Sequence, residues 1–242
     1  MFDFSLEMAG VWAWAGQGLA DPATLAKVRD AVVFLIALVL SIAVHEFGHA
    51  ITADKLGDRT PRYQGRVTLN PLAHADPIGT FVMPLVIFFT GYPLIGWGKP
   101  VMVNPAAFTR KLRMKTAHLL VAAAGPAMNV LLALVITLIF GLLVKIGLLQ
   151  LGTDLSRGVT TVILLNWALA FFNLIPCPPL DGGTVLAGLL PDRFDNVNQF
   201  LRQYGFLILI GLLVTGAIGY FLIPAYHVAG FVTRLVLTIF GV

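Results

Sequence analysis

The chain has 242 residues, of which 58% are hydrophobic and only 12% charged, and it carries a formal net charge of +4. A soluble domain of this size would hold about 25% charged residues, so the composition excludes an ordinary soluble protein. The length suits about 4–6 transmembrane helices with short loops. The single cysteine excludes an intramolecular disulfide. We therefore expect an all-α polytopic membrane protein.

The first part of the chain divides into four stretches. Residues 1–23 are apolar but broken by glycines, and their two tryptophans predict a segment at the membrane interface. The first membrane span is expected over 24–56. Residues 57–77 combine Pro, Gly and Asn with β-forming residues, which predicts a loop with short strands. Residues 78–97 are apolar but interrupted by prolines and glycines, so either a re-entrant hairpin or a full span fits them.

Three clearer spans follow, over 116–149, 159–175 and 204–223. A polar link precedes the last of them. The apolar tail over 228–242 is too short to cross a bilayer comfortably, so we expect a half-span or an interfacial helix there.

The basic residues predict an orientation. Eleven of the 16 Lys and Arg flank the end of the first span, the start of the 116–149 span and the link before 204, and this side is expected to face the cytoplasm. Both flanks of 78–97 then lie on that side, which favours the re-entrant hairpin. The eleven are Lys55, Arg59, Arg62, Arg66, Lys99, Arg110, Lys111, Arg113, Lys115, Arg193 and Arg202.

The motif with the clearest chemistry is HEFGH, which starts at the end of the first apolar run. On a helix, His45 and His49 share a face and can bind one metal ion, while Glu46 can reach a water on that ion. HExxH also arises by chance, in about one chain of this length in a hundred. Chance matches fall mostly on exposed helices, however, whereas ionisable groups at membrane depth are costly and usually functional.

A catalytic zinc usually has three protein ligands and one open position. The strongest candidate for the third ligand is Asp181, in the stretch NLIPCPPLDGG, which ends the 159–175 span on the same side as HEFGH. Three prolines stop the helix there, and two glycines let the chain turn closely past an ion. The alternative is that Asp181 only caps the following helix.

With these motifs, and with GPAMN at 125–129, the chain resembles the site-2 protease family of intramembrane zinc metalloproteases, in the compact bacterial branch without PDZ or CBS domains. The resemblance implies a metalloprotease core over 24–190, followed by C-terminal membrane helices over 191–242. It also implies a short β or re-entrant element near the active site. One Zn²⁺ per chain is expected on His45, His49 and Asp181.

The resemblance further implies that the protein cleaves transmembrane substrates within the bilayer, in regulated intramembrane proteolysis at the inner (plasma) membrane, with no nucleic-acid partner. Glu46 would be the base, and Asn173 would bind the substrate or the oxyanion. Asn173 could instead tie the broken helix end together. Asn129 is expected to serve helix packing more than catalysis. Cys177 is expected to be a small buried residue.

Two other functions remain open at this point. A non-proteolytic relative could keep the metal site as a scaffold, although Glu46 then has no evident task. A transporter-like protein could also place ionisable residues in the membrane, but the chain shows none of the internal repeats that are common in transporters.

Overall fold

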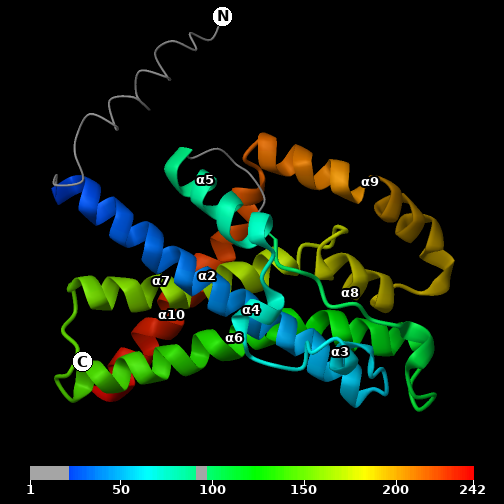
Figure 1. Cartoon of the computed structure of the whole chain (residues 1–242), viewed down its shortest axis with the longest axis horizontal. Coiled ribbons are helices and arrows are strands. Elements are labelled where there is room, and N and C mark those ends of the chain that lie inside the picture. The colour runs from blue at the N-terminus through cyan, green and yellow to red at the C-terminus, as the bar shows by residue number, and fades with distance from the viewer. Residues whose placement is uncertain (1–21, 91–96) are drawn as a thin grey trace, which may run out of the picture.

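The computed structural model describes residues 22–90 and 97–242, and the regular structure in these ranges is entirely helical (Figure 1). Five of the described helices are long and apolar enough to cross a membrane, in agreement with the all-α polytopic fold expected. Residues 1–21 of the interfacial segment expected over 1–23 lie outside the described residues. The five helices are α2 (Pro22–Lys55), α6 (Met114–Lys145), α7 (Asp154–Asn173), α9 (Asp195–Val214) and α10 (Ile218–Phe240).

Helices α6, α7 and α10 share one hydrophobic core, and α2 packs across α6 and α7 (Figure 1). The buried members of this core include Ala133 and Phe140 of α6, Ile163 and Trp167 of α7, and the small residues Ala225 and Ala229 of α10. Small side chains let helix backbones approach closely, which is how helices associate in lipid. The last helix is therefore part of the same bundle as the helices that precede it.

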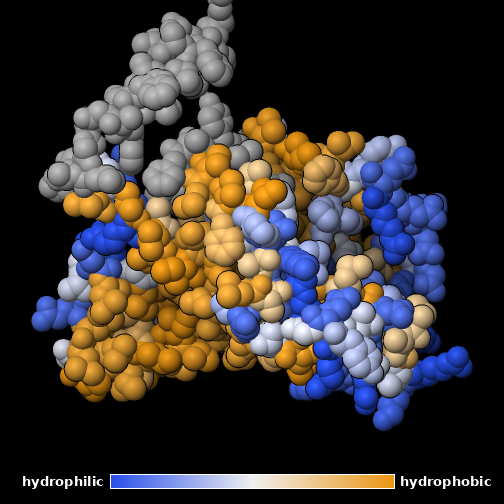
Figure 2. Space-filling view, in the orientation of Figure 1, coloured by the Kyte–Doolittle hydropathy of each residue, from blue (hydrophilic) through white to orange (hydrophobic). Residues whose placement is uncertain are grey.

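The outer faces of the bundle are apolar as well. Val32, Ile36 and Leu40 are exposed on α2, as are Leu134 and Leu138 on α6. Figure 2 shows this hydrophobic surface over the left and centre of the view, with hydrophilic residues gathered at the right, where α2 ends and α6 begins. Such a surface suits contact with lipid, so the molecule is a multi-pass membrane protein.

The strands expected over 57–77 are absent from this stretch, so that prediction was wrong. Two four-residue helices stand there instead, α3 (Thr60–Tyr63) and α4 (Pro71–His74). Each has a proline at its start, where a missing N–H is tolerated. The Asn70 side chain accepts a hydrogen bond from Leu72 N at 3.1 Å and caps α4. The prolines and the asparagine therefore start helices here and do not mark turns between strands.

The apolar stretch from 78 to 97 is described as far as residue 90 and again at residue 97. A π-helical segment, η1 (Pro77–Val82), continues into α5 (Met83–Thr90). At the return, Trp97 N donates to Gly79 O at 3.0 Å, and Trp97 O accepts from Thr80 Oγ1 at 3.0 Å. The two described ends of the stretch therefore meet, as a re-entrant segment requires and a single crossing does not allow.

The C-terminal part differs from the expectation in two respects. The span expected over 204–223 is wrong, because α9 ends at Val214 and α10 begins at Ile218. Helix α10 runs unbroken for 23 residues, so the prediction of a short tail helix over 228–242 was wrong. The chain turns at Gly216, whose φ of 72° suits glycine, and Pro224 lies inside α10 and does not separate two helices. Gly241 lies beside Lys145, so the C-terminal end of α10 meets the end of α6. The short elements of this half are η2 (Pro105–Ala107), α8 (Asp181–Leu189) and η3 (Asp192–Phe194).

Candidate metal centre

Three side chains from two distant parts of the sequence converge beside α6. His45 and His49 lie one turn apart on α2, and their Nε2 atoms are 3.1 Å from each other. Asp181, the first residue of α8, places Oδ2 at 3.1 Å from His45 Nε2 and 3.4 Å from His49 Nε2. Among the described residues, these three form the one group of histidines and acids arranged to hold a metal ion.

The donor set fits zinc. Tetrahedral zinc with bonds of about 2.0–2.1 Å keeps its ligand atoms roughly 3.3 Å apart, close to the separations found here. Asp181 Oδ2 is buried, and no group donates a hydrogen bond to it. The Nδ1 atoms of the two histidines are already engaged, by Asn129 Oδ1 at 2.6 Å and Val121 O at 2.8 Å. Both Nε2 atoms are thus free to bind the ion.

The turn before α8 directs Asp181 to this place. The N-cap of α8 is Leu180, and no hydrogen bond from the α8 backbone reaches the Asp181 carboxylate. A Cβ at Gly183 would lie 2.6 Å from Pro178 N, so only glycine lets α8 pack this closely on the proline turn. The Asp181 side chain therefore faces the two imidazoles, and it does not cap its own helix.

A second glycine forms the floor of the centre. A Cβ at Gly125 of α6 would lie 2.7 Å from His45 Nε2 and would press on the His49 ring even more closely. Gly48 of α2 allows an equally close approach to α6, since a Cβ there would lie 2.6 Å from Ala124 O. The two glycines let α2 lie against α6 with both imidazoles between the helices.

We expect Gly125→Ala to lower zinc content by at least about tenfold, because the added methyl group displaces both imidazoles. Zinc per chain, measured on purified protein, checks this. Gly211→Ala is the matched control, since a Cβ there meets nothing within 4 Å. Full zinc content in Gly125→Ala would contradict the close contact between position 125 and the two imidazoles.

Glu46 lines the same cavity as the three convergent residues. Its Oε2 accepts a hydrogen bond from Val101 N at 3.1 Å. Val101 belongs to the segment 97–104, which forms no helix. The segment is anchored on both sides of Val101: Lys99 N donates to His74 O at 2.8 Å, and Asn104 N to the buried Asp58 Oδ2 at 2.6 Å. The Glu46 carboxylate is thus held by the segment that follows α5, from the side opposite α2.

Two further residues of the NLIPCPPLDGG stretch lie nearby. Asn173 lines the cavity, and its Nδ2 donates to Leu169 O at 3.0 Å, one turn back in its own helix. Cys177 is buried, and its Sγ donates to Gly205 O at 3.1 Å. Burial raises the pKa of the Cys177 thiol, so this sulfur stays protonated at neutral pH. Cys177 thus serves packing between the turn and α9.

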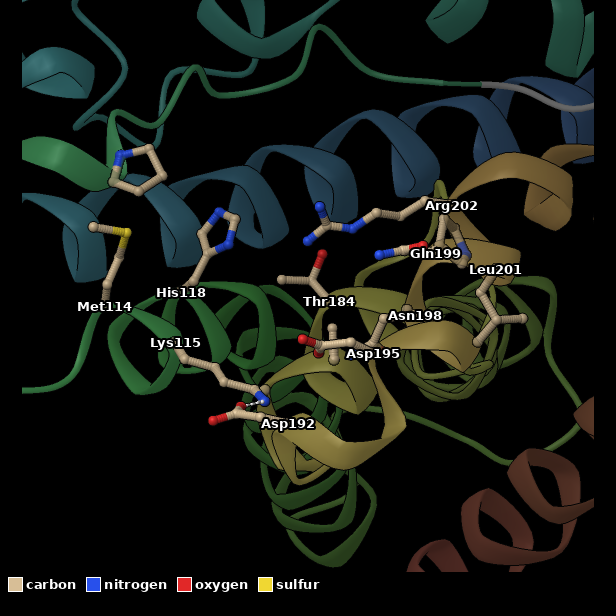
Figure 3. Close-up of a pocket in the computed structure, with 15 residues that line it drawn as sticks. Met114, Lys115, His118, Thr184, Asp192, Asp195, Asn198, Gln199, Leu201 and Arg202 are labelled. Carbon is tan, nitrogen blue, oxygen red and sulfur yellow. Dashed lines mark hydrogen bonds and ion pairs between the residues drawn. The ribbon is translucent and has the colours of Figure 1, made fainter.

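The metal-centre cavity encloses about 950 Å³ and is bordered mainly by apolar residues of α2, α7 and α9, such as Leu38, Phe172 and Phe206. A second cavity of about 860 Å³ adjoins it, and His118 and Thr184 border both. Figure 3 shows this second cavity, in which Arg202 extends from α9 toward His118 and Thr184, and Lys115 pairs with Asp192. An apolar space and a polar space therefore meet beside the centre.

Sequence reasoning missed part of the surroundings of His45. Asn129 was expected to serve packing, yet its side chain hydrogen-bonds His45 directly. Asn166, in the middle of α7, and Ser41, one turn before His45, were not singled out at all. The available signal was a polar side chain at membrane depth in an otherwise apolar span.

The model of peptidase family M50 matches residues 33–162 and 146–214 of this chain. The chain is 37% identical over 193 residues to "Putative zinc metalloprotease YwhC" of Bacillus subtilis, covering 78% of this chain and 84% of that protein. It is 29% identical over 215 residues to "Putative zinc metalloprotease Rip2" of Mycolicibacterium smegmatis, covering 86% and 76%. The Rip2 protein of Mycobacterium tuberculosis (strain H37Rv) is 28% identical over 208 residues. No solved structure matches the chain.

Proposed function

Because the chain belongs to peptidase family M50 and is a zinc metalloprotease of the site-2 type, we propose that it hydrolyses peptide bonds within or beside the transmembrane helices of membrane proteins, in regulated intramembrane proteolysis. The observation that carries the proposal is the convergence of His45, His49 and Asp181 in a cavity bordered by Glu46 and by apolar residues of the bundle. A protease with its centre among membrane-spanning helices suits substrates that lie in the same bilayer.

We propose that His45, His49 and Asp181 hold the ion. A zinc ion there supplies Lewis acidity toward a water molecule and toward the scissile carbonyl. Glu46 accepts the proton that the water loses as its oxygen attacks the carbonyl carbon, and delivers it to the leaving nitrogen as the C–N bond breaks. Its hydrogen bond from Val101 N fixes one carboxylate oxygen and leaves the other for this transfer.

Asn173 is proposed to act on the substrate from the other wall of the cavity. Its Nδ2 has two protons, and the bond to Leu169 O uses one of them. The second proton is available to a substrate carbonyl or to the oxygen that gains charge during attack. Asn173 would in this way both tie the end of α7 and bind the substrate.

The substrate is proposed to enter the apolar cavity as an unwound segment and to lie alongside residues 97–103. An intact helix engages its own peptide groups, so the chain must be extended at the point of cleavage. The segment 97–103 forms no helix, and in the part of the chain that the structure describes it pairs with no strand. Pairing along such an edge is a common way to bind an extended peptide.

The adjoining polar cavity is proposed to supply water and to receive the polar flank of the substrate. It opens from the centre past Thr184, which lies one helical turn after Asp181 on α8. The amide side chains of Asn198 and Gln199 and the guanidinium of Arg202 line it from α9. By the distribution of basic residues, this end of the bundle faces the cytoplasm, and the membrane is the inner (plasma) membrane.

The function is tested with purified protein reconstituted in liposomes together with a test protein that has one transmembrane helix. We expect cleavage within or beside that helix, loss of cleavage on zinc chelation and recovery with added Zn²⁺. Mass spectrometry of the fragments locates the cut. Cleavage that persists without metal, or no cleavage of helices of varied stability by zinc-loaded protein, would contradict the proposal.

Replacing Gly98 by valine is expected to lower cleavage at least about tenfold with zinc content unchanged. A Cβ at 98 would lie 2.7 Å from Ile42 Cγ2, so the larger side chain pushes the 97–103 segment away from α2. Cleavage rate and zinc content are measured on the same preparations. Gly211→Val is the comparison, because a Cβ at Gly211 meets nothing within 4 Å. Equal cleavage by the Gly98 variant would remove the support for pairing along this segment.

A further inference from the structure

We propose that Asn129, Asn166 and Ser41 form a buried relay that holds His45 in the one tautomer able to bind the metal ion, an inference that rests on the zinc site of the proposed function. The three residues come from α6, α7 and α2, and none of them is exposed to solvent. Asn166 and Ser41 act through Asn129, so they are positioning residues.

The relay begins at the imidazole. His45 Nε2 faces His49 and Asp181, so Nδ1 must carry the ring proton if Nε2 is to offer its lone pair to the ion. Nδ1 lies 2.6 Å from Asn129 Oδ1, which accepts this proton. The Asn129 amide must then present its oxygen, and not its nitrogen, to the ring.

The rest of the relay fixes the direction of that amide. Asn129 Nδ2 has two protons and donates them to Ser41 O at 3.2 Å and to Asn166 Oδ1 at 2.9 Å. Asn166 Nδ2 in turn donates to Ser41 Oγ at 2.9 Å and to Val162 O at 2.9 Å. Ser41 Oγ donates its own proton to Ala37 O at 2.7 Å. Every amide and hydroxyl proton therefore has an acceptor.

The reverse orientation is excluded by the backbone carbonyls at the end of the relay. A flipped Asn166 would set its oxygen against Val162 O, and a flipped Asn129 would set its oxygen against Ser41 O. A carbonyl oxygen can only accept, so either flip places two acceptors together in a buried site. Two backbone carbonyls thus determine, through two amides, which nitrogen of His45 carries the proton.

His49 reaches the same tautomer by a shorter route, since its Nδ1 donates directly to Val121 O at 2.8 Å. That acceptor is a backbone group and no substitution removes it. The tautomer of His45, in contrast, depends on side chains and can be changed by mutation. This difference lets the two ligands be tested separately in one protein.

The test uses Asn129→Leu and Asn166→Leu, which remove the relay at its first and second steps. Thr137→Val is the matched control, because Thr137 is equally buried on α6 and its hydroxyl bonds only Ala133 O of the same helix. We expect zinc affinity, measured by competition with a chelator, to fall about 10–100-fold in Asn129→Leu and by less, up to about tenfold, in Asn166→Leu. The control should match the wild type.

A spectroscopic readout separates orientation from packing. In the Co²⁺-substituted protein, the exchangeable Nδ1 protons of bound imidazoles give shifted proton NMR signals, one each for His45 and His49. We expect both signals in the wild type and in Thr137→Val, and only the His49 signal in Asn129→Leu. If the leucine variant fails to fold, Asn129→Ala is used, because it removes the acceptor for His45 and places no oxygen against Ser41 O. It should lose the His45 signal, so retention of both signals there counts against the relay.

Two results would overturn the inference. One is zinc affinity in both leucine variants within threefold of the Thr137→Val control. The other is retention of both imidazole signals in Asn129→Leu. In either case a wild type that binds zinc leaves the proposed function intact, because the relay alone has failed. A wild type that binds no zinc would instead remove the metal centre, and with it the premise.

Discussion

Replacing Glu46 by glutamine is expected to lower peptide hydrolysis by at least about 10²–10⁴-fold while the protein still binds one zinc ion per chain. The variant loses the group that accepts and delivers the proton, but it keeps the shape of the side chain. The amide oxygen of glutamine can still accept the hydrogen bond from Val101 N, so the 97–104 segment should stay in place. The loss would then report proton transfer and not a displaced cavity wall.

The measurement pairs the cleavage rate in liposomes with the zinc content of the same preparation. Gln64→Glu is a matched control for the change between amide and acid, because Gln64 is exposed in the loop after α3 and should have no effect. Residual cleavage by Glu46→Gln within threefold of the wild type would show that another group takes the proton. A wild type that cleaves nothing under the same conditions would count against the protease function as a whole.

Replacing Asp181 by alanine is expected to remove zinc from the protein almost completely. Loss of a residue that only orients a ligand weakens zinc binding about 10–100-fold, and loss of a ligand itself should exceed that. Two histidines that remain on one turn of α2 make a weak site. In the protein without metal, Asp181 Oδ2 is buried and accepts no hydrogen bond. Its removal therefore costs no hydrogen bond, and folding should not suffer.

Zinc content by elemental analysis, together with chelator competition, checks this second expectation. Asp192→Ala is the matched control, because that carboxylate lies on the next helical segment and pairs with Lys115 at the surface. Full zinc content in Asp181→Ala would mean that a different residue completes the site. Equal loss in both variants would point to a general effect of lost charge at this end of the bundle.

Most of the membrane spans, and the convergence of the three candidate metal ligands, could be predicted from the sequence for physical reasons that are visible in single residues. A long apolar run leaves little choice but a membrane helix, and His45 and His49 are neighbours on any helix. Asp181 was placed beside them by topology, since both motifs end a span on one side. In the structure, all three lie within reach of one ion.

The wrongly predicted elements are those in which one residue type, such as proline, is compatible with two different structures. A proline marks a turn or the first residue of a helix, and at Pro71 it starts α4. A break was expected between residues 223 and 228, yet Pro224, which lies there, is tolerated inside the packed membrane helix α10. The contact of Asn129 with His45 joins residues 84 apart in sequence, so no local pattern could place it.

The bond between Val101 N and Glu46 Oε2 has a consequence for selectivity. The peptide group that steadies the base belongs to the same segment, 97–103, beside which an extended substrate would lie. A substrate paired there would be held in a register set by backbone hydrogen bonds, and Glu46 would lie at a fixed position along the segment. The position of the cut would then depend on where the substrate helix unwinds and on the register in which the unwound segment pairs. Side-chain identity at the cut would matter little, and helices of unrelated sequence but similar fragility would be cleaved alike.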